Sequence, residues 1–232
     1  IFPIIEPVKS DFSALNRAIL EMCKNNVECT LIVNPKTGKK PVKKEVILDK
    51  LFGGTIKKCH NVSIGYMLDS QSKLSNLLSL LNEYKKFDFS IIHCGYTNGK
   101  YLSSKIGKFT NIKNHIFIDG SAGKLYQRHL KKDGIKRILI RNGFKPQKKN
   151  AHYPPSEHFS ELHITYPDEG MDGFGDYLIV GDDYSETGGP AYAVAIHLTY
   201  LALDDNMFIY HFVSDQTDSP TDPGGKFLES LE

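Results

Sequence analysis

The feature that most constrains the fold is a repeated alternation of short apolar runs with helical patterns. The runs are rich in β-branched and aromatic residues, as strands are. They cover residues 2–6, 29–34, 62–67, 87–94, 115–119, 137–141 and 176–181. Near-continuous apolar strands that alternate with helices predict a parallel sheet covered by helices. Seven or eight such units predict one α/β domain over residues 1–232, a (β/α)8 TIM-barrel-like fold, with a doubly wound open sheet as the alternative.

Two of the helical patterns carry an apolar stripe that would face the core. Asp11 is placed to cap the first helix and Ser70 the second. The stripes are Phe12, Leu15, Ile19 and Met22 in the first helix, and Leu74, Leu77, Leu78 and Leu81 in the second. They indicate helices that cover a sheet, not a cofactor site.

The regular pattern ends near residue 145. Residues 145–155 read as a basic, proline-containing linker, and the serine at position 156 predicts a short helix over residues 156–163. Further on, alternating side chains predict a β-hairpin made by residues 194–201 and 208–213. We therefore expect the last barrel units to be irregular.

The cysteines, the absence of a long apolar segment and the first residues indicate where the protein is located and whether the chain extends further. Cys23, Cys29, Cys59 and Cys94 match neither a zinc-binding nor a thioredoxin spacing, and they predict reduced thiols in a cytoplasmic protein. No segment is long and apolar enough to span a bilayer, so we expect no membrane partner. Because strand-like sequence starts at Ile1 without an initiator Met, we expect a further segment before it.

Charge is divided unevenly along the chain. Residues 1–150 hold 28 Lys and Arg against 11 Asp and Glu, whereas residues 151–232 hold 1 against 16. This asymmetry predicts an anionic partner, such as nucleic acid, for the basic part, and a cation site or a protein partner for the acidic part. The alternative is that the two parts attract each other within one fold. No helix-turn-helix, RNP or zinc-finger pattern is present.

Polar residues stand at the ends of six of the apolar runs, at the end where barrels carry their active sites. They are Glu6, Asn34, His93, Asp119, Arg141, and Asp182 with Asp183. If the runs are parallel strands, these side chains share one rim and form a site. The alternative is that strands simply end where polarity resumes.

Carboxylates and histidines on this rim suit a divalent metal ion. We predict Asp119, Asp182 and His211 as catalytic residues, and Asp119, Asp182 and Asp183 as ligands of Mg²⁺ or Mn²⁺. The predicted hairpin places His197 opposite His211, either as a ligand pair or as two half-buried rings.

Two glycine pairs resemble the phosphate-binding loops of barrels. Gly188 and Gly189 follow the seventh run, and Gly224 and Gly225 precede Lys226 at the start of the last helix. Arg141 and Lys226 would supply positive charge to the phosphate. The alternative is that these glycines serve tight turns.

Several motifs together resemble a known family. They are residues 4–9 (IIEPVK), 181–185 (GDDYS), 188–192 (GGPAY), 193–197 (AVAIH), 211–215 (HFVSD) and 224–227 (GGKF). The chain is similar to the uncharacterised bacterial beta family proteins, most densely over residues 176–228. The resemblance implies a barrel-like fold and a phage-defence or mobile-element context, and it implies no catalytic residues.

Two functions follow from these patterns. The first is a metal-assisted hydrolase, a phosphoesterase that acts on a nucleotide or nucleic acid. The second is a non-catalytic binding subunit whose basic and acidic halves dock nucleic acid and a protein partner.

Overall fold

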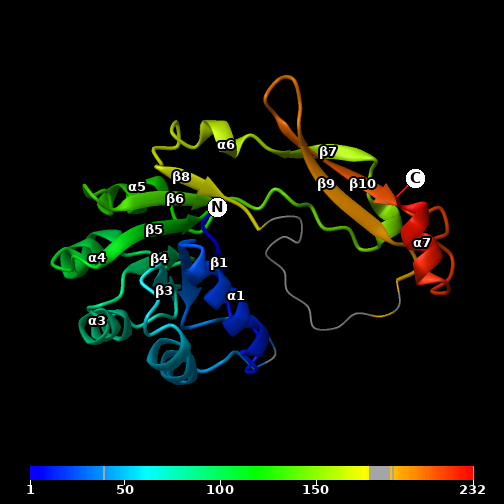
Figure 1. Cartoon of the computed structure of the whole chain (residues 1–232). Coiled ribbons are helices and arrows are strands. Elements are labelled where there is room, and N and C mark those ends of the chain that lie inside the picture. Colours follow the sequence, from blue (N-terminus) through cyan, green and yellow to red (C-terminus); the bar gives the residue numbers. More distant parts are fainter. Residues whose placement is uncertain (39, 178–188, 190, 232) are drawn as a thin grey trace. The chain divides into compact units, whose positions relative to one another are not determined.

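The computed structural model describes residues 1–38, 40–177, 189 and 191–231 (Figure 1). Its contacts divide the chain into two compact units, Ile1–Leu139 and Ile140–Glu232. Asp182, Asp183 and Gly188 lie outside the described residues.

The larger sheet has seven strands, and their order in space is their order along the chain. Its strands are β1 (Ile4–Ile5), β2 (Cys29–Ile32), β3 (Val62–Leu68), β4 (Phe89–His93), β5 (Ile112–Ile118), β6 (Lys136–Ile140) and β8 (Gly173–Gly175). The connecting helices are α1 (Ser13–Lys24), α2 (Lys44–Ile47), α3 (Leu74–Glu83), α4 (Gly99–Ile106) and α5 (Lys124–His129). A π-helical segment, η1 (Leu48–Thr55), continues α2.

The α/β class and the parallel sheet are confirmed, but the closed (β/α)8 barrel is wrong. The sheet is a curled half-barrel whose edges, among the described strands, are β1 and β8. Regular strand–helix repeats stop after β6, and a three-residue strand, Gly173–Gly175, takes the next place in the sheet. Residues 178–181 of the expected seventh strand lie outside the described residues. The order shows no reversal, which distinguishes this sheet from a doubly wound one.

Burial on both faces explains why these strands read as continuous apolar runs. β2 and β4 are buried along their whole length. One face carries a row of small polar side chains that satisfy one another: Ser63 Oγ donates to Thr30 Oγ1 at 2.8 Å, and Asn114 Nδ2 donates to Ser90 Oγ at 3.0 Å. The opposite face carries apolar and ring side chains against the helices.

The predicted helix stripes are confirmed, the predicted cap at Asp11 is displaced by one residue, and the predicted cap at Ser70 is wrong. Ile19, Leu77 and Leu81 are fully buried. The N-cap position of α1 is Phe12, but Asp11 Oδ1 still accepts hydrogen bonds from the amide and hydroxyl of Ser13, the first residue of the helix; α3 starts after Lys73 without a side-chain cap.

The prediction of four reduced thiols is wrong for two of them. Cys23, in the last turn of α1, and Cys59, which precedes β3, form a disulfide with Cα atoms 5.8 Å apart. Cys29 is a buried free thiol and Cys94 is a half-buried one. A spacing of 36 residues gives no signal of this pairing, since only the fold brings the two turns together. The expected cytoplasmic location loses the support of reduced thiols and stays a prediction.

The second unit contains an antiparallel sheet in the order β7-β10-β9. Its strands are β7 (Ser156–Ser160), β9 (Ala195–Leu201) and β10 (Met207–Val213). The predicted hairpin is confirmed with His211 directly opposite His197. The predicted helix over residues 156–163 is wrong, because pairing with β10 makes residues 156–160 a strand and only α6 (Leu162–Thr165) is helical. The unit also holds η2 (Asn150–His152) and α7 (Pro223–Glu229).

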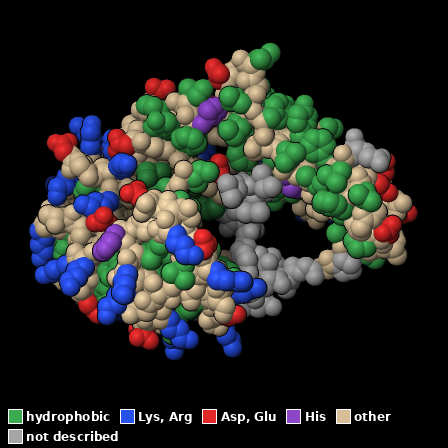
Figure 2. Space-filling view, viewed as in Figure 1, with side chains coloured by type: hydrophobic (Ala, Val, Ile, Leu, Met, Phe, Trp, Pro, Cys, Tyr) green, Lys and Arg blue, Asp and Glu red, His purple; other side chains and the backbone are tan. Residues whose placement is uncertain are grey.

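The two faces of this small sheet differ. Its inner face builds a core from Phe144, Phe159 and Ile209, against which Tyr153 and Met207 pack. Its outer face exposes apolar side chains, visible over β9 and β10 in Figure 2. Of these, Leu198, Tyr210 and Phe212 are 57%, 43% and 41% exposed.

Over the described residues, no helix combines the length and the apolar character that crossing a membrane requires.

Candidate functional site

Glu6 and Asn34 follow β1 and β2, where the sequence predicts them, but both are bound to backbone groups. Glu6 Oε1 accepts hydrogen bonds from the amides of Lys36 and Thr37 at 2.5 and 2.8 Å. Asn34 exchanges two hydrogen bonds of 2.8 Å with the backbone of Met67. These side chains fix loops at the sheet edge. Because their oxygen and nitrogen atoms already make these hydrogen bonds, they have less capacity left to bind a ligand.

His93 ends β4 but lies on the helix-facing side of the sheet and is completely buried. Its Nδ1 lies 2.7 Å from Tyr126 Oη, and its Nε2 lies 2.9 Å from His115 Nδ1. Burial, with a contribution from His115, holds the pKa of His93 well below its ordinary value. This neutral network packs α5 on the sheet and is closed to a substrate.

Asp119 follows β5 and is exposed, and its Oδ1 accepts a hydrogen bond from the amide of Gly120 at 3.0 Å. Its proposed partners Asp182 and Asp183 lie outside the described residues. The Asp119–Asp182–Asp183 metal site therefore stays a prediction. Within the described part of the chain, no three His, Cys, Asp or Glu side chains are arranged to hold a metal ion.

Arg141 follows β6 and is paired with two carboxylates. Its Nη1 lies 3.5 Å from Glu161 Oε1, and its Nη2 lies 3.1 Å from Glu169 Oε1. A phosphate at this guanidinium would have to compete with both carboxylates.

The phosphate-binding role of the two glycine pairs stays a prediction, but the described glycines have the following surroundings. Gly189 is exposed, and a Cβ atom added there would meet nothing within 4 Å. Gly224 and Gly225 start α7, where the amide of Gly225 already donates to Asp222 Oδ1 at 3.0 Å. Asp222 is thus the anion at this helix start.

Lys226 does not supply charge to a ligand either. It is 1% exposed, and its Nζ donates to the carbonyls of Tyr192, at 2.9 Å, and Ser219. A phosphate at Gly224, Gly225 and Lys226 would have to displace these contacts, and the site stays a prediction.

His211 is the predicted catalytic residue that the structure places in a chemically suitable setting. It is 5% exposed on the inner face of the small sheet. Its Nδ1 lies 2.6 Å from His197 Nδ1, and its Nε2 lies 3.3 Å from Glu157 Oε1. A buried imidazole thus joins a carboxylate on β7 to a half-buried imidazole on β9.

Aromatic rings hold both imidazoles in place. Tyr153 stacks on His211 with ring centroids 4.7 Å apart, and it contacts His197 edge-on at 4.6 Å. Phe144 contacts His197 edge-on at 5.2 Å. These packed rings restrict the side-chain torsions of both histidines, so the line of groups from Glu157 to His197 is preorganised.

The segment that carries Tyr153 also brings positive charge. Lys145 Nζ lies 3.5 Å from Glu157 Oε2, and Lys148 and Lys149 follow, both exposed. Burial, then the neighbouring His211, lowers the pKa of His197. A neutral imidazole is suited to proton transfer, and the segment that packs on it carries three lysines that attract an anionic substrate.

Sequence reasoning missed Glu157 because residues 156–163 were read as a helix. The sequence carries no apolar alternation here: Glu157 and Phe159 share the inner face of the strand, Ser156 and His158 face outward, and only Phe159 is apolar. It also missed Tyr153, which stands in a linker without periodicity.

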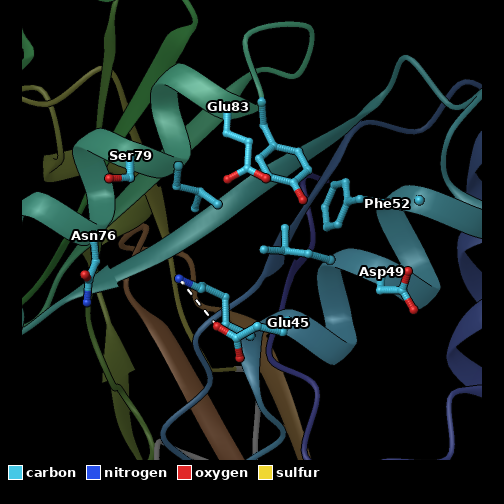
Figure 3. A pocket seen from close by; sticks show the side chains of 11 residues that line it. Glu45, Asp49, Phe52, Asn76, Ser79 and Glu83 are labelled. Carbon is cyan, nitrogen blue, oxygen red and sulfur yellow. Dashed lines mark ion pairs between the residues drawn. The ribbon is translucent and has the colours of Figure 1, made fainter.

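A groove of about 420 Å³ lies between the α2–η1 segment and α3 (Figure 3). Leu48, Phe52 and Leu80 are among its apolar lining residues, and Glu45 and Glu83 bring carboxylates to it. None of the residues predicted for the functional site lines it.

Comparison with known proteins finds no match to this chain among family models, curated proteins or solved structures. The resemblance to the beta family stays a prediction, and function must be argued from the geometry.

Proposed function

We propose that the protein is a hydrolase that acts on a phosphate-containing substrate, with His197 as the general base. The observation that carries this proposal is the line of three groups in one unit, Glu157 to His211 to His197, with separations of 3.3 and 2.6 Å. Hydrolases commonly use an imidazole base that a second group orients.

The contacts of His211 and His197 determine which ring nitrogen of each histidine carries the proton. If Glu157 is ionised, the Nε2 of His211 carries its proton toward Oε1, and its Nδ1 is an acceptor. His197 then donates from its own Nδ1 to His211, which leaves His197 Nε2 with a free lone pair. His197 is the half-buried end of the line and is the group that can reach a substrate.

The reaction is a water attack on phosphorus. His197 Nε2 takes a proton from the water as its oxygen bonds to phosphorus, and the bond from phosphorus to the leaving oxygen breaks. The proton on Nε2 then passes to the leaving oxygen, which regenerates the neutral imidazole. Glu157 stabilises the imidazolium stage through His211, so Glu157 and His211 are positioning residues.

Charge supports a phosphate-containing substrate. Lys145, Lys148 and Lys149 stand in the segment that packs Tyr153 against the two histidines, and exposed ammonium groups attract phosphate oxygens. A nucleotide or a nucleic acid offers such an anion. Assistance by Mg²⁺ or Mn²⁺ at Asp119 stays part of the prediction.

The test is hydrolysis of a phosphodiester and a nucleotide panel by the full chain across a pH series. His197→Gln should abolish turnover, and Glu157→Gln should lower kcat by about 10²- to 10⁴-fold. His158→Asn, on the outer face of the same sheet, is the matched control and should keep full activity. Turnover that survives in His197→Gln would refute the proposal.

A second function, nucleic-acid binding without catalysis, is favoured by where the charge divides. Unit Ile1–Leu139 holds 24 Lys and Arg against 11 Asp and Glu, a net charge of +13, whereas Ile140–Glu232 holds 5 against 16, a net charge of −11. Figure 2 shows Lys and Arg spread over the visible face of the first unit. The acidic unit would dock a protein partner.

This second function predicts RNA or DNA affinity that falls linearly with salt on logarithmic axes. Lys57→Glu with Lys58→Glu should weaken the affinity, while Asp119→Asn should leave it unchanged. A nucleic-acid affinity that changes neither with salt concentration nor in the lysine variant would exclude this second function.

A further inference from the structure

We propose that His197 and His211 form a two-imidazole site for a late first-row divalent metal ion, best matched by Cu²⁺ or Ni²⁺ and next by Zn²⁺. The site does not require the proposed hydrolysis. It would use the Nδ1 atoms of both rings, with water in the remaining coordination positions, and the proton that His197 Nδ1 carries in the metal-free pair would move to His197 Nε2. Imidazole nitrogens are ordinary ligands of these metals, and Mg²⁺ prefers oxygen.

The first argument is the approach of two ring nitrogens across the hairpin. The Nδ1 atoms face each other at 2.6 Å, from residues that are direct partners in the β9–β10 register. With metal–nitrogen bonds of about 2.05 Å, two ligands at right angles stand about 2.9 Å apart, and at the tetrahedral angle about 3.3 Å apart. The right-angled geometry is nearer, which favours the square-planar preference of Cu²⁺ and Ni²⁺.

The second argument is the carboxylate behind His211. A histidine that binds a metal through one nitrogen usually donates its other N–H to a carboxylate, which fixes the tautomer and increases ligand basicity. Glu157 Oε1 lies 3.3 Å from His211 Nε2, which is an ion-pair distance, and both atoms are buried without a hydrogen-bond partner in the described residues, so a small adjustment would bring the N–H onto the carboxylate. The tautomer that this contact favours leaves Nδ1 of His211 free of a proton and able to bind a metal.

The third argument is that only one ring needs to move. His211 is held by burial and by the stack on Tyr153, whereas His197 is half-buried. Opening the nitrogen–nitrogen distance from 2.6 Å by a few tenths of an ångström requires a small rotation of the His197 side chain. The pair is therefore nearly in the geometry of a chelate.

The experiment uses the full chain after treatment with a chelator and its removal. Cu²⁺, Ni²⁺, Zn²⁺ and Mg²⁺ are titrated separately by calorimetry, and the Cu²⁺ adduct is examined by electron paramagnetic resonance. We expect one equivalent of Cu²⁺ to bind with the hyperfine pattern of two equatorial nitrogens, and no binding of Mg²⁺ at this site. Because the chain has nine histidines, the result is read as a difference between variants.

Three variants test whether the bound Cu²⁺ occupies the proposed site. His197→Asn should remove the tight equivalent and its two-nitrogen signal. Glu157→Gln should weaken Cu²⁺ affinity about tenfold, as loss of an outer carboxylate does. His158→Asn, in the same sheet on its opposite face, should bind as the unmodified chain does.

A tight equivalent that persists in His197→Asn would overturn the metal site. So would a Cu²⁺ signal with a single nitrogen in the unmodified chain. Since metal binding is measured without substrate, and hydrolysis is measured with Mg²⁺ added and without Cu²⁺, Ni²⁺ or Zn²⁺, the two proposals fail separately. Loss of metal binding with full hydrolysis would reject only the metal site, and metal binding without hydrolysis would reject only the hydrolase.

Discussion

The Nε2 atom of His93 lies 2.9 Å from the Nδ1 atom of His115, inside the first unit and away from water. Burial, with a smaller contribution from Arg137, lowers the pKa of His115 to about 4. Both rings are therefore neutral in the folded protein at pH 7, and the pair links the stability of the first unit to pH.

Acid should destabilise the first unit before its carboxylates titrate. A folded-state pKa below the unfolded value of about 6.5 means that the unfolded chain binds more protons, so stability is lost as pH falls from about 6.5 toward 4. His115 alone accounts for about 3 kcal/mol over this range. Urea unfolding at a series of pH values measures the effect, and the exposed His60→Asn change should leave it intact. A flat free energy of unfolding from pH 7 to pH 4.5 would contradict this.

Tyr126→Phe should destabilise the same region without altering its packing. The hydroxyl of Tyr126 is the partner of His93 Nδ1 at 2.7 Å, and its loss leaves a buried polar atom unpaired at a cost of about 1–3 kcal/mol. The matched control is Tyr101→Phe, because the Tyr101 side chain is 48% exposed. Equal changes in the two variants would show that the buried hydrogen bond is not important for stability.

Reduction should weaken the first unit. Removing the Cys23–Cys59 disulfide by the double change Cys23→Ser and Cys59→Ser should cost about 3–4 kcal/mol, since the bond closes a loop of 36 residues in the unfolded chain. Adding a reductant should lower the melting temperature of the unmodified chain and leave that of the double variant unchanged. Four titratable thiols in the denatured, unreduced chain would show that the bond does not form.

Gly143→Ala should disturb the second unit. A Cβ atom at position 143 would stand 2.5 Å from the carbonyl oxygen of Phe159, so the segment that carries Phe144 and Tyr153 would have to move away from β7. We expect a loss of about 1–3 kcal/mol in urea unfolding. At Gly123 a Cβ atom would meet nothing within 4 Å, so Gly123→Ala should be nearly neutral.

The strands and helices of the first unit can be predicted from the sequence because the patterns that indicate them are local. Strands buried on both faces read as apolar runs, and the stripes that contain Ile19 and Leu77 mark helices by their own spacing. Closure of the barrel depends on the later chain, where short strands and turns carry no such period. The disulfide likewise depends on two turns that meet only in the fold.

The candidate site follows the same rule: contacts that are local along the chain can be predicted, and distant ones cannot. His197 and His211 share a hairpin, so a five-residue connection sets their register and the sequence predicts their pairing. Glu157 reaches His211 from a strand that is distant along the chain, and the Ser156 start of that strand also resembles a helix cap. Lys226 looked like a phosphate ligand because charge in a sequence does not reveal burial.

Burial of Lys226 also gives the C-terminal region a chemical reporter. It is the sole lysine after position 149, and its amine is enclosed with two carbonyl oxygens as acceptors. An acylating reagent should label the exposed lysines of the native chain at once and reach this amine only when the region around α7 opens. The labelling rate of one peptide, read by mass spectrometry, would then follow local opening at this end of the chain, independently of the disulfide-linked first unit.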